Sequence, residues 1–229
     1  MPIILDFGGS VQDYVAHFAR IVFSRPTCCP HCGQRDRLIG HGFYWRKAKD
    51  QTEVYHIQIN RWFCKACRAT LSVLPSFVLR FRHYLLVVIQ AVVVARYEDN
   101  ASWQETTQRC ATDGLPALRT IGRWCRSFGE QAPVWWAAVQ TTLALQDSSS
   151  SALDPLGPAS GLHDAPRALL DAATHLLAWA KTRWPEVVGY GLKDRLRFLW
   201  HWGFGAAWRG WYDPHSLRTV QEGGRVVCS

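Results

Sequence analysis

Cys29-Pro30-His31-Cys32-Gly33 and Cys64-Lys65-Ala66-Cys67 are the two stretches that decide how the amino-terminal part of this chain folds. Each contains a C-x2-C pair, and 31 residues separate the two pairs. Two residues between cysteines let a tight turn present both sulfurs to one ion, and a structural zinc ion takes four such ligands in a tetrahedron. Gly33 adds the backbone freedom that a turn needs just after its second ligand. We therefore expect Cys29, Cys32, Cys64 and Cys67 to bind one structural Zn²⁺.

Other interpretations of these cysteines are weaker. A redox C-x-x-C pair usually lies at a strand-to-helix junction, and iron–sulfur clusters use other spacings. Four thiolates also fill the shell of the metal, so no position is left for a catalytic water. One local alternative stays open, because Cys28 or His31 can substitute as a ligand in a slipped register. The positions of Pro30 and Gly33 favour Cys29.

The residues between the cysteine pairs predict two β-strands, at about 37–46 and 53–63. In the second strand Tyr55, Ile57 and Ile59 alternate with polar residues, which is typical of a strand with one buried face. A hairpin of this kind runs out and back, so it brings the two distant cysteine pairs together. This layout predicts a zinc ribbon over residues 26–76, preceded by an amphipathic helix within residues 1–25.

Positive charge is concentrated on this part of the chain. The net charge is +8, and residues 35–82 hold ten basic groups against three acidic ones. A local excess of this size favours a polyanionic partner, of which nucleic acid is the most common, although a merely solubilising surface has the same composition. The candidate phosphate contacts in and beside the hairpin are Arg46, Lys47, Lys49, Arg61, Arg80 and Arg82.

Three helices, at about 79–97, 102–111 and 116–128, predict a helix-turn-helix, since a turn with Gly114 separates the last two. The third helix of such a fold lies in the major groove of DNA. Here Arg119, Arg123 and Arg126 share one face of that helix, and Thr120 is placed for a phosphate or base contact. A plain helical bundle with a solvated arginine face is the alternative.

Taken together, the C-P-x-C-G knuckle, the hairpin, the second C-x-x-C, "LPSFVLRFRHY" and "TIGRWCRSF" resemble a known module. It is the zinc-ribbon plus helix-turn-helix module of bacterial insertion-sequence transposases and of related small bacterial proteins of mobile elements. The resemblance covers about residues 26–130. It implies recognition of double-stranded DNA, at an element end or an operator, in a mobile-element setting.

The carboxyl-terminal part predicts a different kind of structure. Residues 77–146 hold the helix-turn-helix and one further helix at about 130–145, and 147–166 are rich in Ser, Gly and Pro, which is typical of a flexible linker. Residues 167–229 form a Trp-rich helical segment, with helices at about 167–184 and 192–208, and a tail. These helices either pack on the rest of the chain or bind a second copy or a recombinase partner. The fold class is α+β and mostly helical.

The sequence argues against catalysis and against a membrane location. Acidic residues after Phe128 lie in the linker, in the tail or on predicted helices, whereas a transposase nuclease carries three carboxylates on a strand-rich fold. The longest apolar run, residues 84–95, is shorter than the roughly 20 residues that a membrane span needs. We expect a cytoplasmic, non-catalytic DNA-binding protein, either a transposition-associated factor or a transcriptional regulator, with cysteines that form no disulfides. A degenerate transposase and a protein–protein adaptor are the alternatives.

Overall fold

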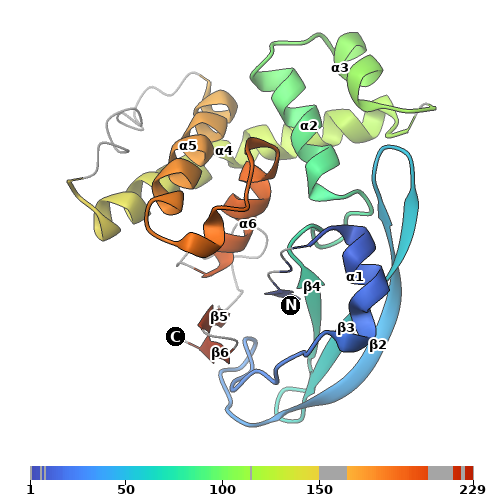
Figure 1. Ribbon diagram of the computed structural model, residues 1–229, viewed down its shortest axis with the longest axis vertical. Coiled ribbons are helices and arrows are strands. Elements are labelled where there is room, and N and C mark those ends of the chain that lie inside the picture. The colour runs from blue at the N-terminus through green and yellow to red at the C-terminus, as the bar shows by residue number, and fades with distance from the viewer. Residues whose placement is uncertain are drawn as a thin grey trace. The chain divides into compact units, whose positions relative to one another are not determined.

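The computed structural model describes residues 2–5, 7, 9–113, 115–149, 164–205, 219–222 and 225–228, and these form an α+β structure (Figure 1). The α+β class is therefore confirmed. The chain divides into two compact units. The first, here called the sheet unit, holds Met1–Lys49 and Glu53–Leu85, together with the chain from Trp200 onward. The second, the helical unit, holds Leu86–Leu199 together with Asp50–Thr52.

The sheet unit is built on a four-stranded sheet in the order β1-β4-β3-β2, formed by the described residues. The long hairpin of β2 (Leu38–Lys49) and β3 (Val54–Cys64) appears where the alternating pattern predicts it, with one irregularity between Gly40 and Phe43. Strands β1 (Pro2–Leu5) and β4 (Thr70–Pro75) were not predicted. They pair in parallel, and β4 also pairs with β3, so the hairpin is extended into a wider sheet.

Helix α1 (Val11–His17) lies against β3 and is followed by the 3-10 turn η1 (Phe18–Arg20). A capping box begins the helix: the Ser10 hydroxyl accepts from the Asp13 amide, and the Asp13 carboxylate accepts from the Ser10 amide. Tyr14 is fully buried and its hydroxyl donates to the Gln58 carbonyl. The amphipathic helix predicted within residues 1–25 is short: Ile21 is already extended, and Val22 is exposed.

The helical unit begins with α2 (Leu86–Tyr97), α3 (Trp103–Cys110) and α4 (Leu118–Gln146). The predicted start of the first helix at residue 79 is wrong, because residues 79–85 form a loop instead. The two helices predicted at 116–128 and 130–145 are one continuous helix, α4. Gly129 does not end it: a Cβ atom there would lie 3.1 Å from the Tyr97 hydroxyl, so this glycine allows a close contact between helices.

After the serine-rich segment, whose residues 150–163 lie outside the described part of the chain, come α5 (Ala165–Lys181), the 3-10 turns η3 (Pro185–Val187) and η4 (Leu192–Asp194), and α6 (Arg195–Gly205). Helix α5 packs along α4. Residues on both sides of the predicted linker belong to one compact unit, which extends from Leu86 to Leu199. The last strands, β5 (Thr219–Glu222) and β6 (Arg225–Cys228), form a small hairpin.

Tryptophan residues supply much of the core of the helical unit. Trp124, Trp135, Trp136 and Trp179 are all buried, and Trp179 meets Trp184 edge to face. Core packing is thus one role of the Trp-rich sequence, while Trp208 and Trp211 lie outside the described residues. None of the described helices is both long and apolar enough to span a membrane.

One polar cluster joins elements of the helical unit that are far apart in sequence. The guanidinium of Arg195, at the start of α6, pairs with Glu98 after α2 and donates to the Thr174 hydroxyl of α5 at 2.9 Å. Nearby, the buried Gln90 amide donates to the Leu192 carbonyl and accepts from the Leu196 amide. These bonds fix the start of α6 against α2, and the Arg195 bonds also reach α5.

Candidate metal centre and basic surface

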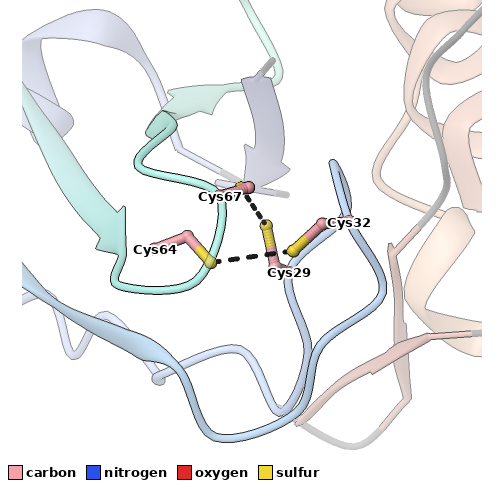
Figure 2. Close-up of side chains that lie close together, drawn as sticks. All are labelled: Cys29, Cys32, Cys64 and Cys67. Atoms are coloured by element: carbon pink, nitrogen blue, oxygen red, sulfur yellow. Dashed lines mark hydrogen bonds between the residues drawn. The ribbon is translucent and has the colours of Figure 1, made fainter.

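Four cysteine side chains converge on one point in the sheet unit (Figure 2). Cys29 and Cys32 come from the loop before β2, Cys64 ends β3, and Cys67 lies in the turn that follows. The four sulfur atoms lie within 4.8 Å of one another. The Cys29–Cys67 pair is 3.7 Å apart and the Cys32–Cys64 pair 3.8 Å. This geometry can hold a metal ion.

The two cysteine turns have the same backbone hydrogen bonds. In the first, the Gly33 amide donates to the Cys29 carbonyl at 2.7 Å; in the second, the Arg68 amide donates to the Cys64 carbonyl at 2.8 Å. The residue after the second cysteine has a left-handed backbone in both turns, with φ of 72° at Gly33 and 59° at Arg68. A bond from the Lys65 amide to the carbonyl of Arg37, just before β2, ties the second turn to the start of that strand.

The hairpin explains why the turns meet. Its register pairs Leu38, the first residue of β2, with Cys64, the last residue of β3, so both turns lie at the open end of the hairpin. Cys29 and Cys64 are buried in an apolar cluster that they share with four residues of β1, β2 and β4. Those residues are Ile3, Leu38, Leu71 and Val73. The cysteine cluster therefore closes one end of the hydrophobic core of the sheet unit.

The thiols differ in how readily they ionise. Burial raises the pKa of Cys29 to about 12, although the His31 amide donates to its sulfur at 3.4 Å. Burial also acts to raise the pKa of Cys64, but hydrogen bonds from the amides of Cys67 and Ala66 outweigh it and lower the value to about 7. One thiolate therefore forms easily at this point. Four thiolates this close together repel each other unless a cation lies between them.

Cys28, Cys110 and Cys125 lie outside this cluster. In the described residues the close group of sulfurs includes Cys29 and not Cys28, so the register with Cys29 is the one that the fold assembles. Cys28 is disulfide-bonded, which corrects the expectation of no disulfides; local spacing cannot reveal a bond that depends on tertiary contact. His31 is exposed. Cys110 and Cys125 are buried free thiols, and burial raises the pKa of Cys125 to about 11.

The first half of α4 displays the arginine face that the sequence predicts. Arg119, Arg123 and Arg126 are exposed, and Thr120 is half-buried. Ile121, Trp124 and Cys125 point the other way and are buried. The residues Leu118–Gly129 include no carboxylate, so this face is wholly cationic.

The six cations in and beside the hairpin have different surroundings. Lys47 is exposed, whereas Lys49 lies over the Tyr84 ring and Arg61 over the Tyr44 ring, each at 5.7 Å. Arg46 is directed inward, and its guanidinium donates to the carbonyls of Leu79 and Arg82. Burial lowers the pKa of Arg46. The half-buried Arg80 and Arg82 lie in the loop that Arg46 holds.

A groove beside these cations was not predicted. It has a volume of about 650 Å³ and is formed by β2, β4 and the loop of residues 79–84, all within the sheet unit. Aromatic residues contribute to its lining, including Trp45 and the highly exposed Phe81. The only sequence signal for it is the mixture of aromatic and basic residues in 43–47 and 80–84, which by itself does not show that the two stretches meet.

Comparison with known proteins gives one match. Residues 29–124 match the model of a family described as a domain of unknown function, DUF6431. The match begins at the first cysteine of the cluster and ends in the first half of α4. Searches of curated proteins and of solved structures found no match.

Proposed function

We propose that the four cysteines bind one structural Zn²⁺. A tetrahedron with Zn–S bonds of about 2.3 Å has edges of about 3.8 Å. Two of the sulfur–sulfur distances, 3.7 and 3.8 Å, agree with that edge. Bound there, the ion would supply charge compensation for four thiolates and a cross-link between the two turns. The hairpin and its cysteine turns would then be a zinc ribbon, with no ligand position left for a substrate.

We further propose that the protein binds double-stranded DNA without cutting it. The single observation that carries this proposal is the cationic face of α4, with Arg119, Arg123 and Arg126 exposed and the opposite face buried. In a helix-turn-helix made by α3 and α4, the start of α4 would enter the major groove. Arg119 and Thr120 are then nearest the bases, and Arg123 and Arg126 lie nearer the phosphates.

The ribbon supports the same proposal as a second basic element. Exposed Lys47 and the cations beside it offer phosphate contacts that are independent of sequence. The family match spans the cysteine cluster, α2, α3 and the start of α4, which favours a module that includes both elements. With the resemblance to the module of insertion-sequence transposases, this supports a transposition-associated factor or a transcriptional regulator. A second copy or a recombinase partner would bind through the carboxyl-terminal helices, where Leu145, Val188 and Leu192 are exposed apolar side chains.

The test combines metal analysis with DNA binding. Purified protein is expected to contain one zinc ion per chain and to shift a labelled duplex in a gel at low salt, with an affinity that falls steeply as salt rises. No strand cleavage is expected with added Mg²⁺ or Mn²⁺. A protein that contains stoichiometric zinc but leaves every duplex unshifted at low salt would refute the DNA proposal, and cleavage would restore the transposase alternative.

A further inference from the structure

The loop of residues 79–84 is fixed to the sheet. Val78 and Leu85 form a bridge that closes it. The Lys49 amide donates to the His83 carbonyl, and the Leu85 amide donates to the Lys49 carbonyl, both at 2.7 Å. The Arg46 guanidinium also donates to the carbonyls of Leu79 and Arg82. The loop is therefore a rigid wall along β2.

Phe81 lies in the turn of this loop, with an unfavourable backbone conformation and an exposed side chain. The Arg82 amide donates to the Leu79 carbonyl, which makes a tight turn, and Phe81 has a φ of 60° in that turn. Residues with a Cβ atom adopt this conformation at a free-energy cost, and glycine usually takes the position. The Phe81 ring is also 80% exposed. The strained backbone and the exposed apolar ring both oppose folding, so Phe81 is a candidate for a binding function and not for core packing.

The surroundings of Phe81 define the chemistry of a ligand. The Arg80 guanidinium lies 4.4 Å from the centre of the Phe81 ring. The groove beside it is lined by aromatic residues Tyr44 and Trp45 and by the cationic or basic residues Lys47 and His83. The described residues that line it include no carboxylate. Flat rings next to positive charge are the combination that binds a base and its phosphate.

We propose that this groove binds an unpaired nucleotide of a DNA strand. The proposal rests on the DNA-binding function and adds a second kind of contact to it. A protein element must protrude to read a duplex groove, whereas this site is concave and, at about 650 Å³, has the size of a small-molecule pocket. Phe81 stacks on the base, and Lys47 and Arg80 neutralise the flanking phosphates. An unpaired nucleotide occurs at a frayed or overhanging DNA end.

The experiment compares two labelled DNA probes that share one duplex, one blunt and one with a short single-stranded overhang. Fluorescence anisotropy with the full chain should show tighter binding to the overhang probe. Phe81→Gly should reduce the affinity for that probe about tenfold and leave the blunt duplex unchanged, because stacking on one base contributes a factor of this order. Phe81→Trp should retain the preference.

Two controls separate loss of stacking from loss of folding. Phe81→Gly relieves the strained backbone, so its melting temperature should equal or exceed that of the wild type. Phe43→Ala removes another exposed aromatic ring of β2 that is not part of the groove lining, and it should keep the overhang preference. Millimolar free dAMP serves as a competitor: weak competition is expected if the strand, and not the isolated nucleotide, is the ligand.

The outcomes are distinct. If neither probe binds, the DNA-binding function itself fails. If both probes bind equally, or if Phe81→Gly weakens both by the same factor, the nucleotide groove is rejected and the duplex-binding function stands. Retention of the overhang preference by Phe81→Gly also overturns the proposal. Strong competition by free dAMP would replace the strand with a free nucleotide as the ligand.

Discussion

Gly33 and Arg68 hold equivalent positions in the two cysteine turns, each just after the second cysteine and each with a positive φ. Glycine adopts this backbone freely, whereas a residue with a Cβ atom is disfavoured there by about 1–2 kcal/mol. A Cβ atom at Gly33 would meet no other atom within 4 Å, so the difference between the two positions is one of backbone conformation alone. The second turn therefore carries strain that the first does not.

The two positions predict opposite effects of exchanging glycine for a residue with a Cβ atom and the reverse. Gly33→Ala should destabilise the sheet unit by about 1 kcal/mol, because alanine must adopt the left-handed conformation. Arg68→Gly should stabilise it by up to about 1 kcal/mol, reduced by the greater flexibility of glycine in the unfolded chain. Urea unfolding measures both changes. Equal effects of the same sign would contradict the explanation from φ.

The metal ligands can be tested by single substitutions. Cys67→Ser should lose most of the bound zinc, because a hydroxyl replaces one of the four thiolates. Cys28→Ser and Cys110→Ser should keep one ion per chain, since neither residue belongs to the group of close sulfurs. Atomic emission on dialysed protein gives the ratio. Loss of metal in Cys28→Ser with retention in Cys29→Ser would reverse the ligand assignment.

Acid should release the ion. Protons compete with the metal for the thiolates, and burial raises the pKa of Cys29 to about 12, so that thiol holds its proton strongly whenever the metal is absent. Binding of the metal therefore expels protons, and its affinity must fall as the pH falls. A chromogenic zinc chelator should record release on acidification and rebinding on return to neutral pH. A metal content independent of pH would argue against thiolate ligands.

At the scale of elements, α4 is the best-supported candidate for recognition of DNA. Replacing Arg119 and Arg123 by alanine should weaken duplex binding at least about tenfold. It should also lower the slope of log affinity against log salt by about 0.9 for each phosphate that the variant no longer neutralises. Arg167→Ala is the matched control, since Arg167 is an exposed arginine near the start of α5. An equal loss in the control would show that general charge, and not this helix face, is responsible.

Local patterns predicted some elements and not others. The β2–β3 hairpin, the cysteine cluster, α3 and the buried face of α4 all follow from alternation, spacing and periodicity within short stretches. Strands β1 and β4 were missed because their parallel pairing joins Pro2 to Ser72. The groove was missed for the same reason: Arg46 reaches a loop more than thirty residues away, and no local pattern records such a contact.

The division of α4 into two predicted helices was an error of another kind. Gly129 and Pro133 both read as helix breakers, yet the helix runs through them. Gly129 faces the Tyr97 hydroxyl, which in turn donates to the Cys125 carbonyl, so the contact with α2 outweighs the low helix propensity of glycine. Tertiary packing therefore keeps α4 continuous at Gly129. A single sequence does not show that Tyr97 of α2 will pack against this glycine.

At the scale of the whole molecule, the ion pair of Arg195 and Glu98 ties the start of α6 to the residues that follow α2, within the helical unit. The Arg195 side chain is 7% exposed and that of Glu98 35%. Glu98→Ala should therefore leave a buried charge without its carboxylate and destabilise the protein by about 2–3 kcal/mol, after allowance for the partial exposure of Glu98. Denaturant unfolding monitored by tryptophan fluorescence reports on this unit directly.

The neighbouring carboxylate provides the control. Asp99 pairs with Arg109 at 3.3 Å, but both side chains are about half exposed, at 49% and 54%. Asp99→Ala should cost less than about 1 kcal/mol. Zinc content should be unchanged in both variants, because the cysteines belong to the sheet unit. A similar cost for the two substitutions would mean that Arg195 is not buried as described.

The length of α4 determines how far a small tilt moves its arginine face. Its 29 residues make a rod about 43 Å long, with the arginine face near one end and the contact with α5 extending toward the other. A tilt of only about 5° at the α5 end displaces the arginine end by about 4 Å, roughly the spacing between adjacent base pairs. In the proposed complex with DNA, a partner that tilts α4 through α5 by this angle therefore shifts the arginines by about one base-pair step.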